Sequence, residues 1–456
     1  MVKYALDLAK TEQKLGHRMS ILYPGTIYKR NSTHVRIKKA KEISNMEAYV
    51  ILNPLPIPLA SGIKDCAWYA SQEGYSAYLE FLKAHRPDVI HVHSLMGIHE
   101  SFFEAANHLG IRLVYTSHDY FGLCPTTTLQ MRGEVCAQTD WSACAFCCQH
   151  AFSAAHLILD QSVLVQKTLQ TRLGKATLDF LTIEKQRFLG TGKAQPQDGT
   201  QVTQHTCVEK EEKRQMLQGE SIELIGQRME YLNLSEYYKK IFRRIDFYHF
   251  NSEIAQEEFE KRIGQVAHVV LPITSCSVTD KRRKRSYNGS LRVGYLGADT
   301  QAKGFPVLYR CMQDLQEEKQ SIVLNTYFGI KKSGAEFWHQ HRPYRYEELE
   351  KIMDENDVIL VPSTWRETFG LVVLEALSFG VPVVVSENVG AQILLKGKKA
   401  MGCILKGELH TAIRNCLREM SENKEVLRLW NRNICEAELD FSMEDHAMRI
   451  VEFCYR

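Results

Sequence analysis

The sequence lacks features that would place it in several other classes of protein. No apolar run approaches the ~18 residues that a membrane-spanning helix needs. Residues 2–9 form an amphipathic helical pattern in place of the apolar segment of a secretory signal. The formal net charge is only +3, from 57 Lys and Arg against 54 Asp and Glu, which argues against a dedicated nucleic-acid binder. We therefore expect a cytoplasmic protein whose cysteines are mostly reduced.

Three catalytic signatures are also absent. The chain has no Gly-x-x-x-x-Gly-Lys-Ser/Thr loop of NTPases and no Gly-x-Ser-x-Gly elbow of α/β hydrolases. It has no Asp-x-Asp pair after a strand, which would hold a divalent ion on a diphosphate. What remains is 456 residues of ordinary globular composition, 44% hydrophobic and 24% charged, which is enough for two or three domains.

Two stretches of the chain alternate strand-like and helix-like segments. The first extends to about residue 272, with helices expected at 2–15, 69–84 and 97–108 and strands at 18–23, 88–92 and 111–115. The second begins near residue 291, with strands expected at 291–296, 321–328, 358–362 and 383–385 and helices at 304–316, 346–355 and 370–379. This alternation predicts an α/β chain with two doubly wound parallel sheets.

The predicted domains are residues 1–274 and 291–440, joined by a linker at 275–290. The linker contains the basic run 281–285, which is either a solvated connection or a site for an anionic membrane surface or acidic partner. Residues 175–226 are polar without a clear period, and they predict an insertion that is partly helical or a loop.

Two carboxylates stand out in the second stretch. Glu367 and Glu375 are separated by seven residues, across a loop that becomes a helix near Gly370. Backbone N–H groups at such a helix start favour a phosphate. Glu375 falls among apolar neighbours, where a charge is costly without a partner, and it can accept hydrogen bonds from ribose hydroxyls. The alternative is that both carboxylates are ordinary exposed charges.

Lys303 follows the strand at 291–296 and the turn that begins at Gly297. A lysine in this place can reach a nucleotide diphosphate and stabilise the charge of the leaving phosphate. Lys-Gly pairs are common in loops, but this pair precedes both carboxylates in the same domain. The pattern therefore predicts a site for a nucleotide diphosphate.

The Glu367-(seven residues)-Glu375 pattern, followed by Gly380-Val381-Pro382 and Val389-Gly390-Ala391, resembles the retaining GT-B glycosyltransferases of family 4. The resemblance covers most of the chain, and further similar segments are 8–17, 91–93, 116–119, 251–253 and 441–443. It implies the GT-B fold: two facing Rossmann-like domains with a C-terminal crossover helix at 441–456. The chain looks most like the branch that builds bacterial surface and capsular polysaccharides.

The resemblance also implies an activity and a set of site residues. The activity is metal-independent transfer of a hexosyl group from a nucleotide-diphosphate sugar to a saccharide or lipid-linked acceptor, with peripheral contact to the inner face of the membrane left open. The catalytic residues are expected to be Lys303 and Glu367, and the acceptor-side residues His93, His118 and Asp119. The expected donor-binding residues are Gly297, Lys303, Glu367, Thr368, Phe369, Gly370, Leu371 and Glu375.

Two departures from the family pattern keep other interpretations open. Ala298 stands where many members have an arginine after the glycine. The chain also begins inside the helix that in the family follows a first strand and a glycine-rich turn, so we expect a truncated reading or a variant with impaired activity. The alternatives are a catalytically impaired, glycosyltransferase-like binding subunit and a GT-B sugar-nucleotide epimerase.

A cysteine-rich loop is expected at 124–150. Cys144 and Cys147 have the two-residue gap that zinc ligands favour, while Cys124 and Cys136 are spaced less regularly. Two interpretations are open. Either these four residues hold a structural zinc or other metal, or they are reduced thiols packed beneath the loop.

Overall fold

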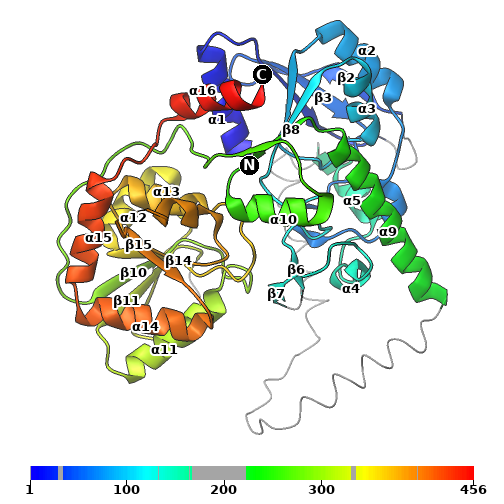
Figure 1. Cartoon of the computed structure of the whole chain (residues 1–456). Helices are drawn as coiled ribbons and strands as arrows, with labels where there is room; N and C mark the ends of the chain where they lie inside the picture. The colour runs from blue at the N-terminus through cyan, green and yellow to red at the C-terminus, as the bar shows by residue number, and fades with distance from the viewer. Residues whose placement is uncertain are drawn as a thin grey trace.

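The chain folds into two domains that lie against each other (Figure 1). The computed structural model describes residues 2–28, 34–131, 133–163, 165–166, 222–329, 335–397 and 399–456. The insertion predicted at 175–226 lies outside the described residues, apart from 222–226, which begin helix α9 (Ile222–Arg243).

The C-terminal domain is built on a six-stranded parallel sheet in the order β12-β11-β10-β13-β14-β15. The strands are β10 (Leu291–Tyr295), β11 (Ile322–Thr326), β12 (Trp338–Gln340), β13 (Val358–Val361), β14 (Val383–Ser386) and β15 (Gly402–Leu405). Every residue of β13 and β14 is buried, as is typical of parallel strands that helices cover on both faces. The four strands predicted in this stretch are therefore confirmed.

Alternate residues of β13 and β14 pack against different pairs of helices. The helices are α11 (Phe305–Glu317), α12 (Leu349–Glu355), α13 (Leu371–Ser378), α14 (Leu409–Glu422) and α15 (Glu425–Glu436). Ile359 and Val383 belong to the core formed with α12 and α13, whereas Leu360 and Val384 belong to the core formed with α11 and α14. The alternation follows from the two-residue period of a strand.

The N-terminal domain has two main sheets. One is parallel, in the order β4-β5-β8-β9, and consists of β4 (Val89–Val92), β5 (Arg112–Thr116), β8 (Phe247–Phe250) and β9 (His268–Val270). The other has the order β1-β3-β2, from β1 (Ser20–Pro24), β2 (Arg36–Lys39) and β3 (Glu47–Leu52). In it β1 runs parallel and β2 antiparallel to β3, and the sequence patterns did not predict β2 or β3.

The helices of this domain are α1 (Val2–Lys14), α2 (Tyr75–His85), α3 (Glu100–His108), α5 (Ala154–Asp160), α9 and α10 (Glu253–Ile263). Among them, α3 packs against β5 and α10 against β8 of the parallel sheet, whereas α2 packs against β2 of the other sheet. The helix predicted from residue 69 begins six residues later, because Gly74 adopts a left-handed conformation at its N-cap. A short hairpin of β6 (Gln130–Met131) and β7 (Glu134–Val135) extends toward the other domain (Figure 1).

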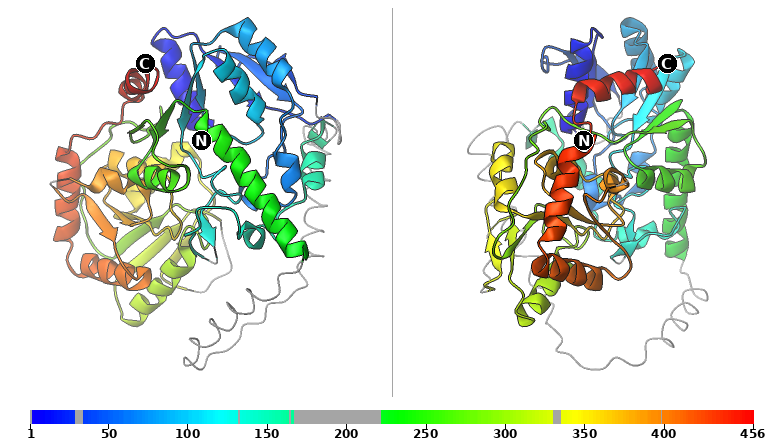
Figure 2. Two further views of the ribbon diagram at one scale, coloured as in Figure 1. Left: turned by 45° about the vertical axis from the view of Figure 1, so that its right-hand side comes forward. Right: turned by 60° about the vertical axis from the view of Figure 1, so that its left-hand side comes forward.

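The last helix returns to the first domain, as predicted. Helix α16 (Met443–Cys454) begins at Ser442, whose hydroxyl accepts a 3.0 Å hydrogen bond from the Asp445 amide. It lies against α1 and β8 (Figure 2), and its residues Ala447 and Ile450 are buried there. The first and last helices of the described chain therefore lie side by side.

The basic run 281–285 is docked on the C-terminal domain. The Lys281 ammonium lies 2.8 Å from a Glu350 carboxylate oxygen, and Arg283 pairs with Asp354. Arg285 donates to the backbone oxygen of Met353 at 2.6 Å. The basic run therefore lies along the surface of the domain, where Lys281 and Lys284 stay exposed to solvent. In the part of the chain that the structure describes, no helix has the length and apolarity to cross a membrane.

Candidate functional site

The two residues predicted to be catalytic are in contact. The Lys303 ammonium lies 2.6 Å from Glu367 Oε1, and the other carboxylate oxygen accepts a 2.6 Å hydrogen bond from the Ser363 hydroxyl. Lys303 also lies over the Trp365 ring, 5.2 Å from its centroid. The Glu367 carboxylate is thus fixed by a cation on one side and a hydroxyl on the other. Ser363 was not predicted, although its place directly after a buried strand was a usable signal.

Backbone geometry brings Lys303 and Glu367 together at the carboxyl edge of the sheet. Lys303 lies in the loop after β10 and Glu367 in the loop after β13, and these strands are neighbours. Gly304 has a φ of 75°, and a Cβ atom there would lie 1.8 Å from the Pro362 carbonyl oxygen. Only glycine allows the two loops to approach this closely. On the other side of the lysine, the Tyr295 hydroxyl donates a 2.7 Å hydrogen bond to the Ala298 oxygen, which folds the loop from Gly297 back on its strand.

Helix α13 begins directly beside this pair. Its N-cap is Gly370, with a φ of 96°, and Phe369 before it is buried. The first N–H groups of a helix have no acceptor within it, so those near Leu371 are available to an anion. A Cβ atom on Gly370 would lie 3.6 Å from the Glu367 carboxylate carbon, which places the helix start close to Glu367. The predicted phosphate site therefore adjoins the Lys303–Glu367 pair.

Glu375 is buried on the second turn of α13, at the boundary with the first domain. Burial raises the pKa of its carboxyl group to about 7, while the Lys3 charge and a hydrogen bond from Tyr346 act in the opposite direction. The Lys3 ammonium lies 3.6 Å from the centroid of the Tyr346 ring and also contacts Ser277. Lys3 therefore brings a second cation to this side of the site from α1 of the first domain. It was not predicted, because nothing local links residue 3 to residue 375.

The predicted acceptor-side residues lie together in the first domain. His93 Nδ1 and His118 Nε2 share a hydrogen bond of 3.1 Å, and Asp119 Oδ1 accepts one of 2.9 Å from the Phe121 amide. Burial lowers the pKa of His93 to about 3 and raises the pKa of Asp119. The pKa of His118 is also lowered by burial, so both imidazoles are neutral near pH 7.

The donor-side loop touches the acceptor-side segment across the domain boundary. The Thr368 hydroxyl donates a 2.9 Å hydrogen bond to the His118 carbonyl oxygen, and the Ser252 hydroxyl donates one of 2.5 Å to the Thr368 oxygen. Gln130 of β6 donates one of 2.9 Å to the Thr364 hydroxyl. The structure thus brings the two predicted groups of residues to opposite sides of one boundary.

The four cysteines predicted to bind a metal lie in the cysteine-rich loop as free thiols. They are Cys124, Cys136, Cys144 and Cys147. Helix α4 (Cys144–Cys147) is a single turn that begins at Cys144 and ends at Cys147. Within the described residues, no three His, Cys, Asp or Glu side chains are placed to hold a metal ion. Burial and the neighbouring sulfur atoms raise the pKa of the Cys144 thiol, which favours the uncharged form. The zinc site remains a prediction without structural support.

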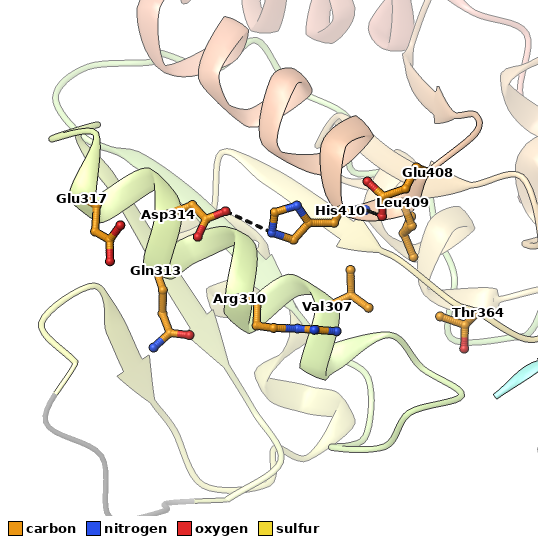
Figure 3. A pocket seen from close by; sticks show the side chains of 9 residues that line it. All are labelled: Val307, Arg310, Gln313, Asp314, Glu317, Thr364, Glu408, Leu409 and His410. Carbon is orange, nitrogen blue, oxygen red and sulfur yellow. Dashed lines mark hydrogen bonds and ion pairs between the residues drawn. The ribbon is translucent and has the colours of Figure 1, made fainter. Parts of the chain in front are cut away.

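A polar groove of about 640 Å³ lies beside the site, between α11 and the start of α14 (Figure 3). Thr364 lines its end nearest the site, and His410 lies 3.1 Å from Asp314 across it. Neither Lys303, Glu367 nor Glu375 lines the groove. It therefore flanks the predicted donor site without forming part of it.

Comparisons with known proteins agree with this geometry. A family model described as glycosyl transferases group 1 matches residues 278–436, and one described as glycosyltransferase family 4 matches residues 1–153. A comparison with curated proteins found no significant match. The solved structure of sucrose-phosphate synthase from Thermosynechococcus elongatus has a TM-score of 0.54 at 14% identity, covering 98% of this chain and 91% of that one.

A second solved structure is similar over the same extent. The catalytic domain of starch synthase IV from Arabidopsis thaliana, bound to ADP and acarbose, has a TM-score of 0.50 at 12% identity, covering 99% of this chain and 94% of that one. At these identities the solved structures show the fold alone, and that fold is GT-B. The fold and the two family models together define the chain as a GT-B glycosyltransferase. Its C-terminal domain matches group 1 and its N-terminal domain matches family 4.

Proposed function

We propose that the chain transfers a hexosyl group from a nucleotide-diphosphate sugar to a saccharide or lipid-linked acceptor in surface polysaccharide synthesis, with retention of anomeric configuration. One observation carries the proposal. The Lys303–Glu367 pair lies beside the start of α13, and Glu375 lies one helical turn further along that helix. This arrangement presents cationic and N–H groups to a diphosphate and a buried carboxylate to a ribose.

In this proposal the positive charges act on the leaving group. The Lys303 ammonium and the N–H groups at the start of α13 stabilise the diphosphate as the glycosidic bond to the donor phosphate breaks. Because Lys303 already contacts Glu367 at 2.6 Å, it is held close to the sugar-binding side of the diphosphate. These groups supply the charge that a divalent ion provides in other transferases, so the proposal includes no step through a metal.

The two carboxylates have different tasks. Glu367, fixed by Lys303 and Ser363, accepts hydrogen bonds from sugar hydroxyls and orients the ring. Glu375 accepts hydrogen bonds from the ribose hydroxyls when it is ionised. Since burial holds its pKa at about 7, nucleotide affinity should increase from pH 6 to pH 8.

In this proposal the acceptor binds to the first domain. His93, His118 and Asp119 lie beside the boundary, and the His118 backbone contacts the donor-side loop through Thr368. Neutral imidazoles can both donate and accept hydrogen bonds, which suits the hydroxyl groups of a saccharide. In the proposal these residues bind the acceptor and direct its hydroxyl toward the donor sugar.

A donor-turnover assay tests the proposed function. Purified protein is incubated with UDP- and GDP-sugars, with and without oligosaccharide acceptors, and products are analysed by NMR. We expect release of the nucleoside diphosphate and a product with the anomeric configuration of the donor. E367A should abolish the signal, which assigns the activity to this chain. Binding without turnover would instead support the impaired binding subunit that Ala298 suggests, and an epimerised sugar would support the epimerase.

A further inference from the structure

The residue directly before Glu367 reaches into the other domain. Arg366 Nη2 lies 2.7 Å from Glu257 Oε2, and Arg366 Nε lies 3.1 Å from Glu258 Oε1. Both glutamates belong to α10 of the N-terminal domain. The side chains of Arg366 and Glu258 are 19% and 8% exposed, so this ion pair is shielded from water, whereas Glu257 is 65% exposed at its rim. Shielded, hydrogen-bonded ion pairs are stronger than surface ones.

Glu258 has a second arginine partner within its own domain. Arg262, one helical turn further along α10, pairs with the same carboxylate and donates a 3.0 Å hydrogen bond to the Cys136 oxygen. If the domains separate, Glu258 keeps Arg262 as its partner and Arg366 becomes hydrated. Breaking a buried ion pair is costly when it leaves a buried charge without a partner. Here loss of the Arg366 contact alone leaves the Glu258 carboxylate with Arg262 as its cationic partner.

The first domain holds both neighbours of Glu367 in the chain. Arg366 contacts α10, and Thr368 is bonded to His118 and Ser252. Glu367 itself forms an isolated parallel bridge with Val389. In extended backbone consecutive side chains point to opposite sides, so Arg366 reaches the first domain while Glu367 faces Lys303.

We propose that Arg366 is a positioning residue through which contact with the first domain fixes the placement of Glu367, an inference that rests on the proposed function. Lys303 and Ser363 hold the Glu367 carboxylate from within its own domain. Glu257 and Glu258 add a restraint from the first domain, because they bind the Arg366 guanidinium and fix the backbone on the N-terminal side of Glu367. Without the Arg366 contact, only the restraints within the second domain remain. A displacement of ~1 Å at a reacting centre can cost about 100-fold in rate.

The matched control is another ion pair between the same helix and the same domain. Lys396 pairs with Glu253 of α10, and both side chains are 47% exposed. K396Q therefore removes an interdomain ion pair without changing the contacts of residues 366–368. We expect R366Q to lower kcat at least 10-fold with nucleotide affinity changed less than 3-fold, and K396Q to change both less than 2-fold. R366K keeps the charge but lacks the planar guanidinium that donates to both glutamates. Its kcat should therefore lie between those of R366Q and the wild type.

Hydrogen exchange tests the role of Arg366 even if the protein shows no turnover. Hydrogen exchange of the peptide covering residues 363–371 should be at least 5-fold faster in R366Q than in wild type, and unchanged in K396Q. Absence of turnover in the wild type would overturn the proposed function, and the exchange result would still decide the role of Arg366. Equal kcat or equal exchange rates in R366Q and K396Q would overturn the inference. If R366Q does not fold, as judged by its melting temperature, the same comparisons are made with R366K.

Discussion

Individual side chains at the site have distinct electrostatic environments. Glu367 is neutralised by Lys303 at 2.6 Å, whereas Glu375 is buried with Tyr346 and Lys3 nearby and has a pKa of about 7. The first carboxylate is thus held by a direct contact with a cation. The second exchanges its proton near neutral pH, because burial opposes its charge more than its neighbours favour it. These environments lead to two predictions.

Substitutions of Lys303 and Glu375 should affect different kinetic constants. K303A removes a cation aimed at the leaving group, so we expect kcat to fall about 100- to 1000-fold. E375A removes an acceptor for the ribose, so we expect nucleotide affinity to fall about 10-fold or more with a smaller effect on kcat. Steady-state kinetics and calorimetry with the nucleoside diphosphate separate the two. K399A, which breaks the exposed pair of Lys399 with Glu436, is the control. Unchanged kinetics in both site variants would contradict these roles.

The stability effect of Glu375 should depend on pH. Its pKa rises from 4.5 in the unfolded chain to about 7 in the folded one, so the folded state binds more protons between these values. The cost of burying the charge is therefore absent below pH 4.5 and complete above pH 7. E375Q should increase the free energy of unfolding by about 3 kcal/mol at most at pH 8. At pH 5 we expect little difference. Denaturant unfolding at both pH values is the measurement, and an equal gain at both would refute the assignment.

At the scale of elements, buried histidines link three strands and one helix of the first domain with the crossover helix. His91 of β4 bonds to the Thr116 hydroxyl of β5 at 2.6 Å, and Thr116 bonds to His249 of β8 at 2.9 Å. His446 of α16 bonds to the Tyr4 hydroxyl of α1 at 2.7 Å. Burial lowers the pKa of His249 to about 4 and of His446 to about 3. The crossover helix is thus held on the first domain partly by imidazoles that must remain neutral.

These histidines should make the fold sensitive to acid. The unfolded chain binds protons below pH 6.5 that the folded chain excludes, so stability falls as pH decreases from 6.5 toward the folded pKa values. For fully buried His249 and His446, each should contribute about 1.4 kcal/mol per pH unit in this range at most. Glu12, whose pKa is about 7, acts in the opposite direction.

Melting temperatures at pH 7, 6 and 5 test this expectation. We expect a clear decrease over this range, since the buried histidines of the N-terminal domain outnumber the three carboxylates with raised pKa values among the described residues, Glu12, Asp119 and Glu375. H446Q keeps a hydrogen-bonding group toward Tyr4 but does not titrate, so its decrease should be shallower than that of the wild type. H17Q changes an exposed histidine and serves as the control. Identical pH profiles for H446Q and the wild type would show that His446 does not contribute.

At the scale of the whole molecule, three sets of contacts hold the two domains against each other. The linker is fixed to α12 by Lys281, Arg283 and Arg285, while α16 is fixed to α1. The donor-side loop is bonded to the first domain through Arg366 and Thr368. The site is therefore complete only when the two domains are in contact.

Docking of the linker should protect its basic run from trypsin. In the wild type we expect slow cleavage after residues 281–285, because Glu350 and Asp354 hold Lys281 and Arg283 against α12. E350A/D354A should be cleaved several-fold faster there, with a melting temperature nearly unchanged, since exposed ion pairs contribute about 0–1 kcal/mol each. Mass spectrometry of the fragments identifies the cleavage sites. E425A, which breaks an exposed pair with Arg428, is the control, and equal cleavage rates in all three proteins would refute linker docking.

Much of the C-terminal domain could be predicted because its patterns are strong and local. Continuous apolar strands such as β13 and β14, each followed by a helix, leave a parallel sheet covered on both faces as the stable arrangement. The first domain was predicted less completely. Strand β2 (Arg36–Lys39) is short and polar, and the start of α2 was misplaced because Tyr69 continues the apolar pattern through a 3-10 turn, η2 (Cys66–Tyr69).

The chain alone determined which chemical groups the site contains, because Glu367, Glu375 and the start of α13 lie within one short segment. The folded molecule decided which groups meet: Lys303 with Glu367, Lys3 near Glu375, and Arg366 with Glu258. The last two join residues more than 100 positions apart, on different domains. Local sequence patterns fix backbone conformation and burial, but packing of the two domains selects these partners, and a pattern within one segment carries no information about that packing.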